Sequence, residues 1–363
     1  MDVLKTDVLV VGGGPAGSTT ARFAALNGAD VTLIEQREEI GVPVKCGELM
    51  PSLDEIKGMF PNAKDIDGLF DVPSEHILRD IEGIKLIDPK GRAISLDFTG
   101  YTTDRALFDQ YLAREAVRAG SKEIKGCSLL SIDGNVATTN QGTVEFKVIV
   151  GADGPGSRVS SQLGMERNRN PYPAVTAQAK GDFEPYVKMF FGGVAPGAYS
   201  WIIPKAGQAN VGVGFSPKFA NGSLNAYFRK FQSMHDLEVT SVLKGKFVPS
   251  EGMLGHLVKG NGLLVGDAAG QVISVNGGGI PLAMIAGKAC GEVVAGNLKD
   301  GRPLMDYEEI CKAIFSKPLG TASRNKRLAD MFAFGSDWRT GICMGLLGRR
   351  RLGNLIRCKS IFP

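Results

Sequence analysis

Short apolar runs and helix-like spacings alternate along the first 35 residues of the chain. Residues 4–11 are rich in Val and Leu and predict a buried strand, and residues 15–27 have the composition of a helix. Residues 31–35 predict a second strand, and glycines fill the turn between the first strand and the helix. The pattern therefore predicts a β-turn-α-β unit at the N-terminus.

Two later apolar runs end in glycine-rich turns that contain an aspartate. Residues 148–153 predict a strand that runs into GADG at 151–154, and residues 263–265 predict one that runs into GDAAG at 266–270. An apolar helix is predicted from residue 282 to about residue 294, directly after three glycines, an isoleucine and a proline. Strands that alternate with helices in this way indicate an α/β protein.

An amphipathic helix is predicted to begin at Arg105. Asp104 directly before it is a suitable N-cap, and Phe108, Leu112 and Ala116 share one face. The same spacing also fits a plain amphipathic helix that binds no ligand.

The first turn has the spacing of a dinucleotide-binding fingerprint. Gly12 permits a tight turn, Gly14 lets backbone amides approach a pyrophosphate, and Gly17 allows close packing of helix on strand. The helix N-terminus directs partial positive charge toward the phosphates, and Glu35 at the end of the second strand is placed to accept hydrogen bonds from a ribose. An ordinary βα turn with chance glycines is the alternative, and the fingerprint alone does not distinguish FAD from NAD.

Composition limits the class of protein. The chain has 363 residues, 43% of them hydrophobic, with 42 basic against 38 acidic side chains, which excludes full disorder and predicts about two domains or one composite fold. No run of about 18 apolar residues predicts a membrane-spanning helix, and the N-terminus lacks the pattern of a secretory signal. We therefore expect a cytoplasmic protein.

Basic charge is concentrated at the C-terminus. Residues 338–363 hold six basic side chains and no acidic one, so 36 of the 42 basic side chains remain against 38 acidic ones in the rest of the chain. Leucines and isoleucines lie between these cations, and such a segment could make peripheral contact with an anionic membrane. A solvated, partly helical C-terminus explains the pattern equally well.

Several other chemistries are not indicated. The six cysteines form no CxxC pair and no zinc spacing, and His76, His235 and His256 lie far apart in the sequence. We therefore expect no metal site and no serine–histidine–aspartate hydrolase. Nucleic-acid binding is not expected either, because basic and acidic side chains balance outside the C-terminal segment.

Three motifs together resemble the FAD-binding flavoproteins typified by p-hydroxybenzoate hydroxylase. They are GGGPAG at residues 12–17, GADG at 151–154 and GDAAG at 266–270, in the order and at spacings similar to that family's. The resemblance implies an α/β fold with a Rossmann-type FAD-binding domain, a β-rich substrate domain and a helical C-terminal segment. Asp267 would bind the ribityl or pyrophosphate part of FAD, and the later glycines would bring a helix N-terminus against the flavin pyrimidine ring.

Two further motifs resemble the geranylgeranyl reductases. PVKCGE at residues 43–48 is similar to their (R/K)CGE segment, and YSWIIP at 199–204 followed by GVG at 212–214 is similar to their YxWxxP…GxG motif. The chain is identified as a member of that family, of the archaeal type that saturates the isoprenoid chains of digeranylgeranylglyceryl ether lipids. Many relatives are longer at the C-terminus, so the resemblance implies a reduced C-terminal cover over the active site here.

The resemblance also implies the site residues. Cys46 could assist proton delivery or gate substrate entry, although a lone cysteine is more often inert. An isoprenoid alkene has no carbonyl to polarise and calls for an aromatic and aliphatic tunnel, although a run such as YSWIIP is also typical of a buried strand. The expected catalytic residues are Cys46, Tyr199 and Trp201, and the expected substrate contacts are Tyr199, Trp201, Phe191 and Phe215. The expected cofactor-binding residues are Gly12, Gly14, Pro15, Ala16, Gly17, Glu35, Lys45, Cys46, Gly47, Arg105, Asp153, Gly154, Asp267, Gly278, Gly279 and Ile280.

The electron donor and two rival functions stay open. No second GxGxxG follows a strand, and family precedent implies NADPH or reduced ferredoxin as donor. An aromatic hydroxylase or halogenase of the same fold is the first rival, because the halogenase motif WxWxIP differs from residues 199–204 only at its first position, although such enzymes are usually longer and lack the CGE segment. A non-catalytic flavin-binding or lipid-binding protein is the second.

The motifs also predict a division into domains. The FAD-binding motifs are interrupted by segments that lack them, so we expect that domain to be discontinuous. We expect an FAD-binding domain from residues 1–70, 100–160 and 258–300, a substrate domain from residues 71–99 and 161–257, and a helical C-terminal segment from residues 301–363.

Overall fold

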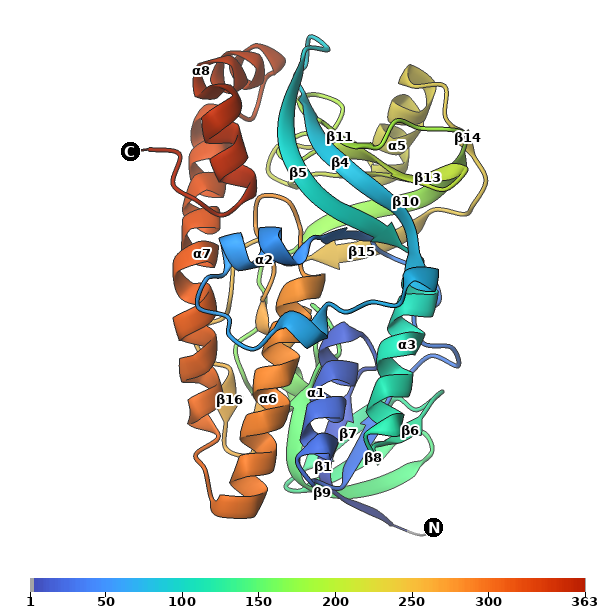
Figure 1. The fold of residues 1–363 in the computed structure, drawn as a ribbon, viewed down its shortest axis with the longest axis vertical. Coiled ribbons are helices and arrows are strands. Elements are labelled where there is room, and N and C mark those ends of the chain that lie inside the picture. Colours follow the sequence, from blue (N-terminus) through green and yellow to red (C-terminus); the bar gives the residue numbers. More distant parts are fainter. Residues whose placement is uncertain (1–2, 363) are drawn as a thin grey trace.

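The computed structural model describes residues 3–362, and two β-sheets organise them (Figure 1). The first sheet has the strand order β16-β17-β9-β1-β2-β6, with β8 paired to β9 and β7 paired to β8. Its strands are β1 (Leu4–Val11), β2 (Val31–Ile34), β6 (Lys122–Ile124), β7 (Leu129–Asp133), β8 (Val136–Thr139), β9 (Gly142–Gly151), β16 (Val258–Lys259) and β17 (Gly262–Leu264).

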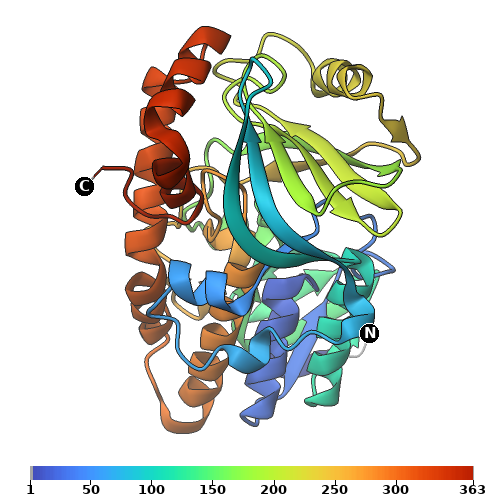
Figure 2. The same cartoon turned by 45° about the horizontal axis from the view of Figure 1, so that its top comes forward.

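The second sheet has the strand order β14-β10-β13-β12-β11-β4-β5-β3, with β15 paired to β10. A long hairpin of β4 and β5 forms one side of it (Figure 2). Its strands are β3 (Leu49–Pro51), β4 (Ile77–Ile87), β5 (Ala93–Thr103), β10 (Tyr172–Lys180), β11 (Tyr186–Phe190), β12 (Ser200–Lys205), β13 (Gln208–Gly214), β14 (Glu238–Val239) and β15 (Lys244–Val248).

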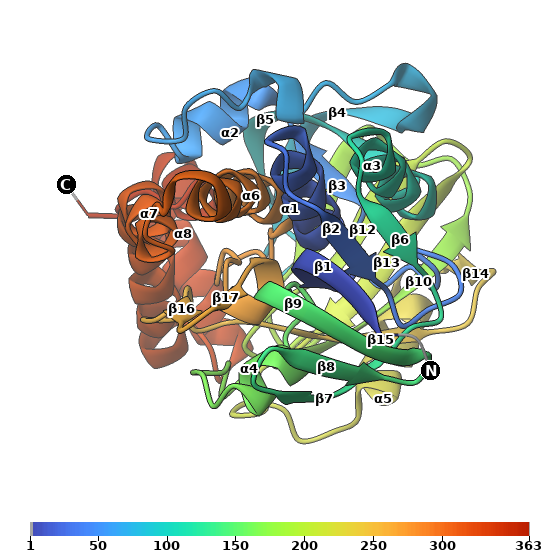
Figure 3. The same ribbon diagram turned by 90° about the horizontal axis from the view of Figure 1, so that it is seen from below.

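Helices cover the first sheet and one side of the molecule. Seen from below, α1, α3 and α6 lie together on one face of the first sheet, with α7 and α8 beyond α6 (Figure 3). The helices are α1 (Pro15–Leu26), α2 (Leu53–Met59), α3 (Arg105–Arg118), α4 (Arg158–Gln162), α5 (Leu224–Met234), α6 (Ile280–Asp300), α7 (Met305–Phe332) and α8 (Asp337–Ile356), with short 3-10 turns at Asp67–Leu69, Ser74–His76 and Gly266–Ala269.

Parallel pairing brings the glycine-rich turns to one edge of the first sheet. Val11 at the end of β1 lies opposite Ile34 of β2 and opposite Gly151 of β9, and Leu264 of β17 lies opposite Gly151 as well. Because parallel strands end at the same edge, the turns that follow β1, β2, β9 and β17 gather there. This edge faces the second sheet, so a site at the edge has both sheets as walls (Figure 1).

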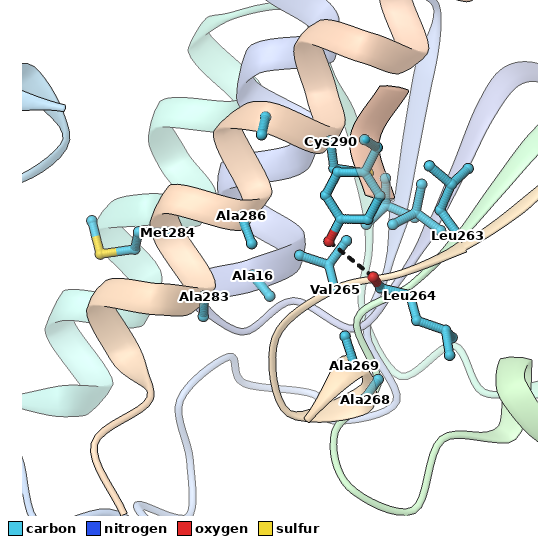
Figure 4. Close-up of a cluster of buried hydrophobic side chains, with 14 of the residues drawn as sticks. Ala16, Leu263, Leu264, Val265, Ala268, Ala269, Ala283, Met284, Ala286 and Cys290 are labelled. Atoms are coloured by element: carbon cyan, nitrogen blue, oxygen red, sulfur yellow. Dashed lines mark hydrogen bonds between the residues drawn. The ribbon is translucent and has the colours of Figure 1, made fainter. Parts of the chain in front are cut away.

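Close packing of α6 on α1 fixes the position of that edge. A Cβ atom at Gly287 would lie 2.7 Å from the carbonyl oxygen of Ala16, so α6 can approach α1 this closely only with glycine there. Around this contact Ala283, Ala286 and Cys290 pack with Ala16 (Figure 4). The small side chains therefore hold the start of α6 beside the turn between β1 and α1.

The C-terminal helices connect the two sheets. α7 leaves the lower end of α6 and runs upward past the second sheet, and α8 packs against β5 (Figures 1 and 2). Tyr307 at the start of α7 is fully buried and donates a hydrogen bond of 2.9 Å to the carbonyl oxygen of Leu264 (Figure 4). Within residues 3–362, no helix has the length and apolar character needed to cross a membrane.

The predicted α/β fold class is confirmed, and the predicted elements lie close to the observed ones. The first strand matches β1, and Asp104 caps α3 by accepting hydrogen bonds from the N–H groups of Ala106 and Leu107 at 3.0 and 3.1 Å. The helix predicted at residues 282–294 is longer, since α6 spans Ile280–Asp300. The division into domains stays a prediction.

Candidate active site

A cavity of about 1020 Å³ lies between the glycine-rich edge of the first sheet and the second sheet. Small-molecule sites usually have volumes of about 300–1,000 Å³, so this cavity is at the upper end of the range. Its walls come from both sheets, from the loop at residues 43–49, and from α6, α7 and α8. One continuous space therefore joins most of the residues that the sequence selects.

The turn between β1 and α1 forms one end of the cavity. The residues of this turn that line the cavity are Gly12, Gly14, Pro15 and Ala16. Gly17 does not line it and packs against the turn instead, since a Cβ at Gly17 would lie 1.8 Å from the carbonyl oxygen of Gly12. Gly14 is the N-cap of α1, and no side chain caps that helix start. The free N–H groups of α1 thus face the cavity and can bind an anion such as a pyrophosphate.

Glu35 presents a fixed carboxylate beside this turn. The side chain is 8% exposed, its Oε2 accepts a hydrogen bond of 2.8 Å from the N–H of Gly13, and its Oε1 accepts one of 3.0 Å from the N–H of Arg37. A carboxylate oxygen accepts more than one hydrogen bond, so capacity remains for the hydroxyls of a ribose.

Asp153 brings a buried oxygen with no partner to the same end. Its Oδ2 accepts hydrogen bonds from the N–H groups of Arg158 and Val159 at 2.6 and 3.1 Å, but Oδ1 is buried and has no hydrogen-bond partner in residues 3–362. Burial raises the pKa of Asp153 above its usual value. Buried polar atoms in proteins are almost always satisfied, so Oδ1 and the adjacent Gly154 fit a bound molecule with hydroxyl donors.

The start of α6 forms the next part of the wall. Gly278, Gly279 and Ile280 line the cavity, and the N-cap Gly279 offers no side chain to the helix. Asp267 also lines the cavity and forms an ion pair of 2.7 Å with Lys246. Two uncapped helix starts, a placed carboxylate and an orphaned buried oxygen together fit FAD.

The loop at residues 43–49 forms part of the cavity wall, and Lys45, Cys46 and Gly47 line the cavity. The sulfur of Cys46 accepts a hydrogen bond of 3.3 Å from the N–H of Glu48. Arg105 lines the same region and holds Asp109 with contacts of 2.8 to 3.1 Å. Burial acts to lower the pKa of Arg105, but Asp109 and the nearby Cys46 outweigh it, so Arg105 remains a cation.

Lys246 is a second cation close to Cys46. Burial acts to lower the pKa of Lys246, but Asp267 and Cys46 overcome that effect and leave the pKa above its usual value. Cys46 therefore shares the cavity wall with two cations, Lys246 and Arg105, each of which is paired with a carboxylate.

A buried polar network that sequence reasoning missed anchors this loop. Glu48 is 1% exposed, and its carboxylate lies 3.0 and 3.1 Å from Nζ of Lys205. Asn210 donates to Oε2 of Glu48 and to the carbonyl oxygen of Cys46, both at 2.8 Å. Glu48 also has a φ of 64°, a backbone conformation that glycine favours, so these contacts hold a strained residue in place. The available signals were Glu48 in the PVKCGE segment and a lysine at the end of the mostly apolar strand β12.

Asn210 connects the same network to Trp201. Its Oδ1 accepts hydrogen bonds of 2.8 Å from Nε1 of Trp201 and of 2.8 Å from the hydroxyl of Thr176. The indole lies over Gly212, where a Cβ would come within 2.1 Å of the ring. The first glycine of the GxG motif thus makes room for the tryptophan of the YxWxxP motif.

Aromatic side chains form one wall of the cavity. Phe191, Tyr199 and Trp201 line it, with ring centroids 6.0 Å apart for the first pair and 5.9 Å apart for the second. Tyr199 donates its hydroxyl to the carbonyl oxygen of Asn276, and burial, with a smaller effect of Cys46, raises its pKa, so it remains a neutral phenol. Phe215 lies outside the lining, where its ring packs 5.6 Å from that of Tyr227.

The far end of the cavity is apolar, and sequence reasoning did not select its residues. Their signal is the helical spacing of Thr340, Cys343, Met344 and Leu347, which places them on one face of α8. This face forms part of the cavity wall, and the reduced C-terminal cover stays a prediction. The apolar lining consists of Met59, Phe60, Ile84, Leu86, Phe98, Val187, Met189, Ala329, Ala333, Phe334, Cys343, Met344, Leu347, Leu352 and Leu355.

Comparisons with known proteins agree with this geometry. The model of the geranylgeranyl reductase catalytic domain matches residues 173–247, and that of the FAD-dependent oxidoreductases matches residues 7–47. A structure described as a geranylgeranyl bacteriochlorophyll reductase-like protein from Thermoplasma acidophilum superimposes with a TM-score of 0.83 at 28% identity, over 93% of this chain and 89% of that one. A probable FAD-dependent monooxygenase from Pseudomonas aeruginosa shares the fold alone, with a TM-score of 0.69 at 16% identity over 93% of this chain and 99% of that one.

Curated relatives that are similar in sequence include digeranylgeranylglycerophospholipid reductases. Digeranylgeranylglycerophospholipid reductase 2 of Methanosphaera stadtmanae is 34% identical over 331 residues, which is 82% of this chain and 80% of that protein. Digeranylgeranylglycerophospholipid reductase 1 of Methanothermobacter thermautotrophicus is 32% identical over 85% of this chain and 83% of that protein. The family resemblance predicted from the motifs is confirmed, and the chain belongs to the digeranylgeranylglycerophospholipid reductase family.

Proposed function

We propose that this protein is an FAD-dependent reductase that saturates the carbon–carbon double bonds of geranylgeranyl chains in archaeal ether lipid precursors. The observation that carries the proposal is the single cavity, which joins a cradle for a dinucleotide at one end to an apolar chamber at the other. An isoprenoid chain has no polar group to bind, so apolar walls that exclude water are what its recognition requires.

The cradle would hold FAD through backbone groups and three carboxylates. The N–H groups at the start of α1 would bind the pyrophosphate, Glu35 would bind the ribose, and Asp153 with Asp267 would bind further hydroxyls. The start of α6 would lie against the flavin ring. When bound, FAD supplies the hydride that the protein itself cannot provide.

Cys46 is the proposed proton donor. Saturating one double bond adds a hydride to one carbon and a proton to the other, and the thiol of Cys46 would release that proton. The N–H of Glu48 orients the sulfur, which lines the same cavity as the cations Lys246 and Arg105. A proton from water then restores the thiol. Tyr199 is a positioning residue in this scheme, since its hydroxyl is occupied by the carbonyl of Asn276.

Two further aspects of the function are proposals of the same kind. NADPH or reduced ferredoxin would supply the electrons, and the test is which of them bleaches the oxidised flavin of the purified protein without oxygen. The protein would also contact the membrane peripherally, since its lipid substrate belongs there and its C-terminal segment is basic.

The deciding experiment is anaerobic. The purified protein is chemically reduced and incubated with unsaturated archaeal-type ether lipid, and the mass of the lipid is followed. We expect stepwise gains of about two hydrogens per double bond together with reoxidation of the flavin. No change in lipid mass, with oxygen-dependent modification of an aromatic substrate instead, would assign the chain to the hydroxylase or halogenase class.

A further inference from the structure

Helix α8 has an apolar face on the outside of the molecule. Trp338, Ile342 and Leu346 follow one another at intervals of one helical turn and are 64%, 50% and 75% exposed. Met331 and Phe332 at the end of α7 are exposed as well. Large apolar side chains gathered on one exposed surface mark a site of interaction with a protein or a membrane.

A shallow groove of about 390 Å³ lies between this face and the turn that joins β4 to β5. Its lining combines the three apolar side chains of α8 with Gly341 and Gly345, and with Lys90 and Arg92 of the turn. The groove therefore has an apolar floor and two cations at its edge, which suits a molecule with an apolar chain and an anionic group.

The two charged side chains that line the groove are cations, and one of them has no acidic partner. Arg92 pairs with Asp88 at 2.6 Å, but within residues 3–362 no ion pair joins Lys90 to a carboxylate. Asp337 at the start of α8 accepts a hydrogen bond of 2.6 Å from the N–H of Gly193. Unpaired cations beside exposed apolar side chains attract anionic lipid headgroups.

The opposite face of α8 lines the cavity through Thr340, Cys343, Met344 and Leu347. One helix thus separates the exposed apolar surface from the chamber proposed to take the isoprenoid chain. A lipid that leaves a bilayer docked on this surface would have only α8 and its neighbours between it and the chamber.

From these observations we propose that the outer face of α8 and the β4–β5 turn dock the protein on an anionic lipid bilayer. The proposal rests on the proposed function and assigns the membrane contact to named residues: Trp338, Ile342, Leu346, Lys90 and Arg92. A second copy of the chain fits less well, because a twofold interface through this face would set the cations of one copy against those of the other.

The test is co-sedimentation with vesicles of phosphatidylglycerol mixed with phosphatidylcholine, compared with vesicles of phosphatidylcholine alone. Wild type should bind the anionic vesicles, and added salt should weaken the binding. The variant Trp338→Gln/Ile342→Gln/Leu346→Gln should lose at least about tenfold in partitioning. The variant Lys90→Gln should lose about fivefold on the anionic vesicles and little on the neutral ones.

Matched controls exclude a general loss of exposed apolar surface or of folding. Leu26→Gln/Leu130→Gln removes two leucines that are 58% and 47% exposed on the first-sheet half of the molecule, and it should sediment as wild type does. All variants should melt at similar temperatures. Fluorescence of Trp338, taken as the difference between wild type and Trp338→Phe, should shift to shorter wavelength when anionic vesicles are added.

Two outcomes overturn the proposal. One is a triple glutamine variant on α8 that sediments as wild type does; the other is a concentration-dependent dimer of wild type that the same variant abolishes. Turnover separates this failure from failure of the proposed function: the α8 variant should reduce detergent-dispersed lipid at the wild-type rate and vesicle-embedded lipid at least about tenfold more slowly. If wild type does not reduce detergent-dispersed lipid, the proposed reductase function is wrong, independently of the result of vesicle binding.

Discussion

The two ends of the cavity are built in different ways. At the cofactor end, the wall consists mainly of backbone N–H groups and of glycines, which have no side chain. Gly12 and Gly14 form the turn, and the N-cap Gly279 leaves the first N–H groups of α6 without a side-chain partner. At the substrate end, side chains from β4, β5, β11, α7 and α8 form an apolar chamber. The first kind of site depends on single atoms at fixed positions, and the second depends on a shape that many residues share.

This difference predicts different responses to mutation. A site made from backbone should fail completely when one Cβ is added, because backbone cannot move aside. A chamber made from side chains should lose activity in steps, because its neighbours can repack.

The largest effect is expected for Gly12→Ala. Gly12 has a φ of 106°, and a Cβ there would lie 2.5 Å from the carbonyl oxygen of Ala152. We expect loss of bound FAD, measured by the flavin absorbance of the purified protein, and destabilisation by at least about 1–3 kcal/mol, measured by denaturant unfolding. The control Gly58→Ala adds a Cβ to α2 at a position where no neighbouring atom lies within 4 Å. This variant should keep its bound FAD and its stability. An FAD-loaded Gly12→Ala protein would contradict a backbone-built cradle.

Cys46→Ser should separate chemistry from cofactor binding. We expect the variant to keep its FAD, since its backbone contacts are unchanged, and to lose about 10²- to 10⁴-fold in turnover, the usual contribution of a positioned proton donor. The measurement is anaerobic single-turnover reoxidation of the reduced flavin by lipid. Cys343→Ser is the matched control, because it removes a second thiol that lines the same cavity from α8. Equal rates for wild type and Cys46→Ser would remove Cys46 from the mechanism.

The cofactor end could be predicted from the sequence because the residues that form it lie close together along the chain. Gly12, Gly14 and Glu35 lie within one β-turn-α-β unit, and strand register alone brings the turns at 151–154 and 266–270 beside them. Of the residues expected at that end, Gly17 is the exception, since it serves helix packing and does not face the cavity.

The substrate end could be predicted only in part. Phe191, Tyr199 and Trp201 belong to the motif region and do line the chamber, but Phe215 lies in the same region and points elsewhere, since its ring packs on Tyr227. The lining residues of α8 are far from these in sequence, and only the tertiary fold brings them together. The same holds for Glu48 and Lys205, whose pairing across 157 positions no local pattern indicates.

Asn210→Ala tests a residue that links the two ends. The substitution leaves the carbonyl oxygen of Cys46 and the indole N–H of Trp201 without their partner, and it removes one of the hydrogen bonds to Oε2 of Glu48. We expect a loss of stability of about 1–3 kcal/mol, because buried polar groups become unsatisfied. Turnover should fall about tenfold with FAD retained, because the loop that carries Cys46 is no longer fixed. Asn62→Ala, which removes one exposed hydrogen bond to Ala313, is the control and should change neither quantity.

The smallest effect is expected for Phe191→Ala. Its comparison with Phe215→Ala tests which phenyl ring contacts the isoprenoid chain. Both remove a half-buried phenyl ring from the second-sheet region, but only Phe191 lines the cavity, where it packs against Tyr199. Losing its apolar contact with an isoprenoid chain should raise the KM for the lipid roughly three- to tenfold and leave FAD binding unchanged. Phe215→Ala should leave KM unchanged, because its ring packs on Tyr227 outside the chamber. Equal increases in KM would show that the chamber extends beyond the cavity walls; no increase in either would place the isoprenoid chain against α7 and α8 instead.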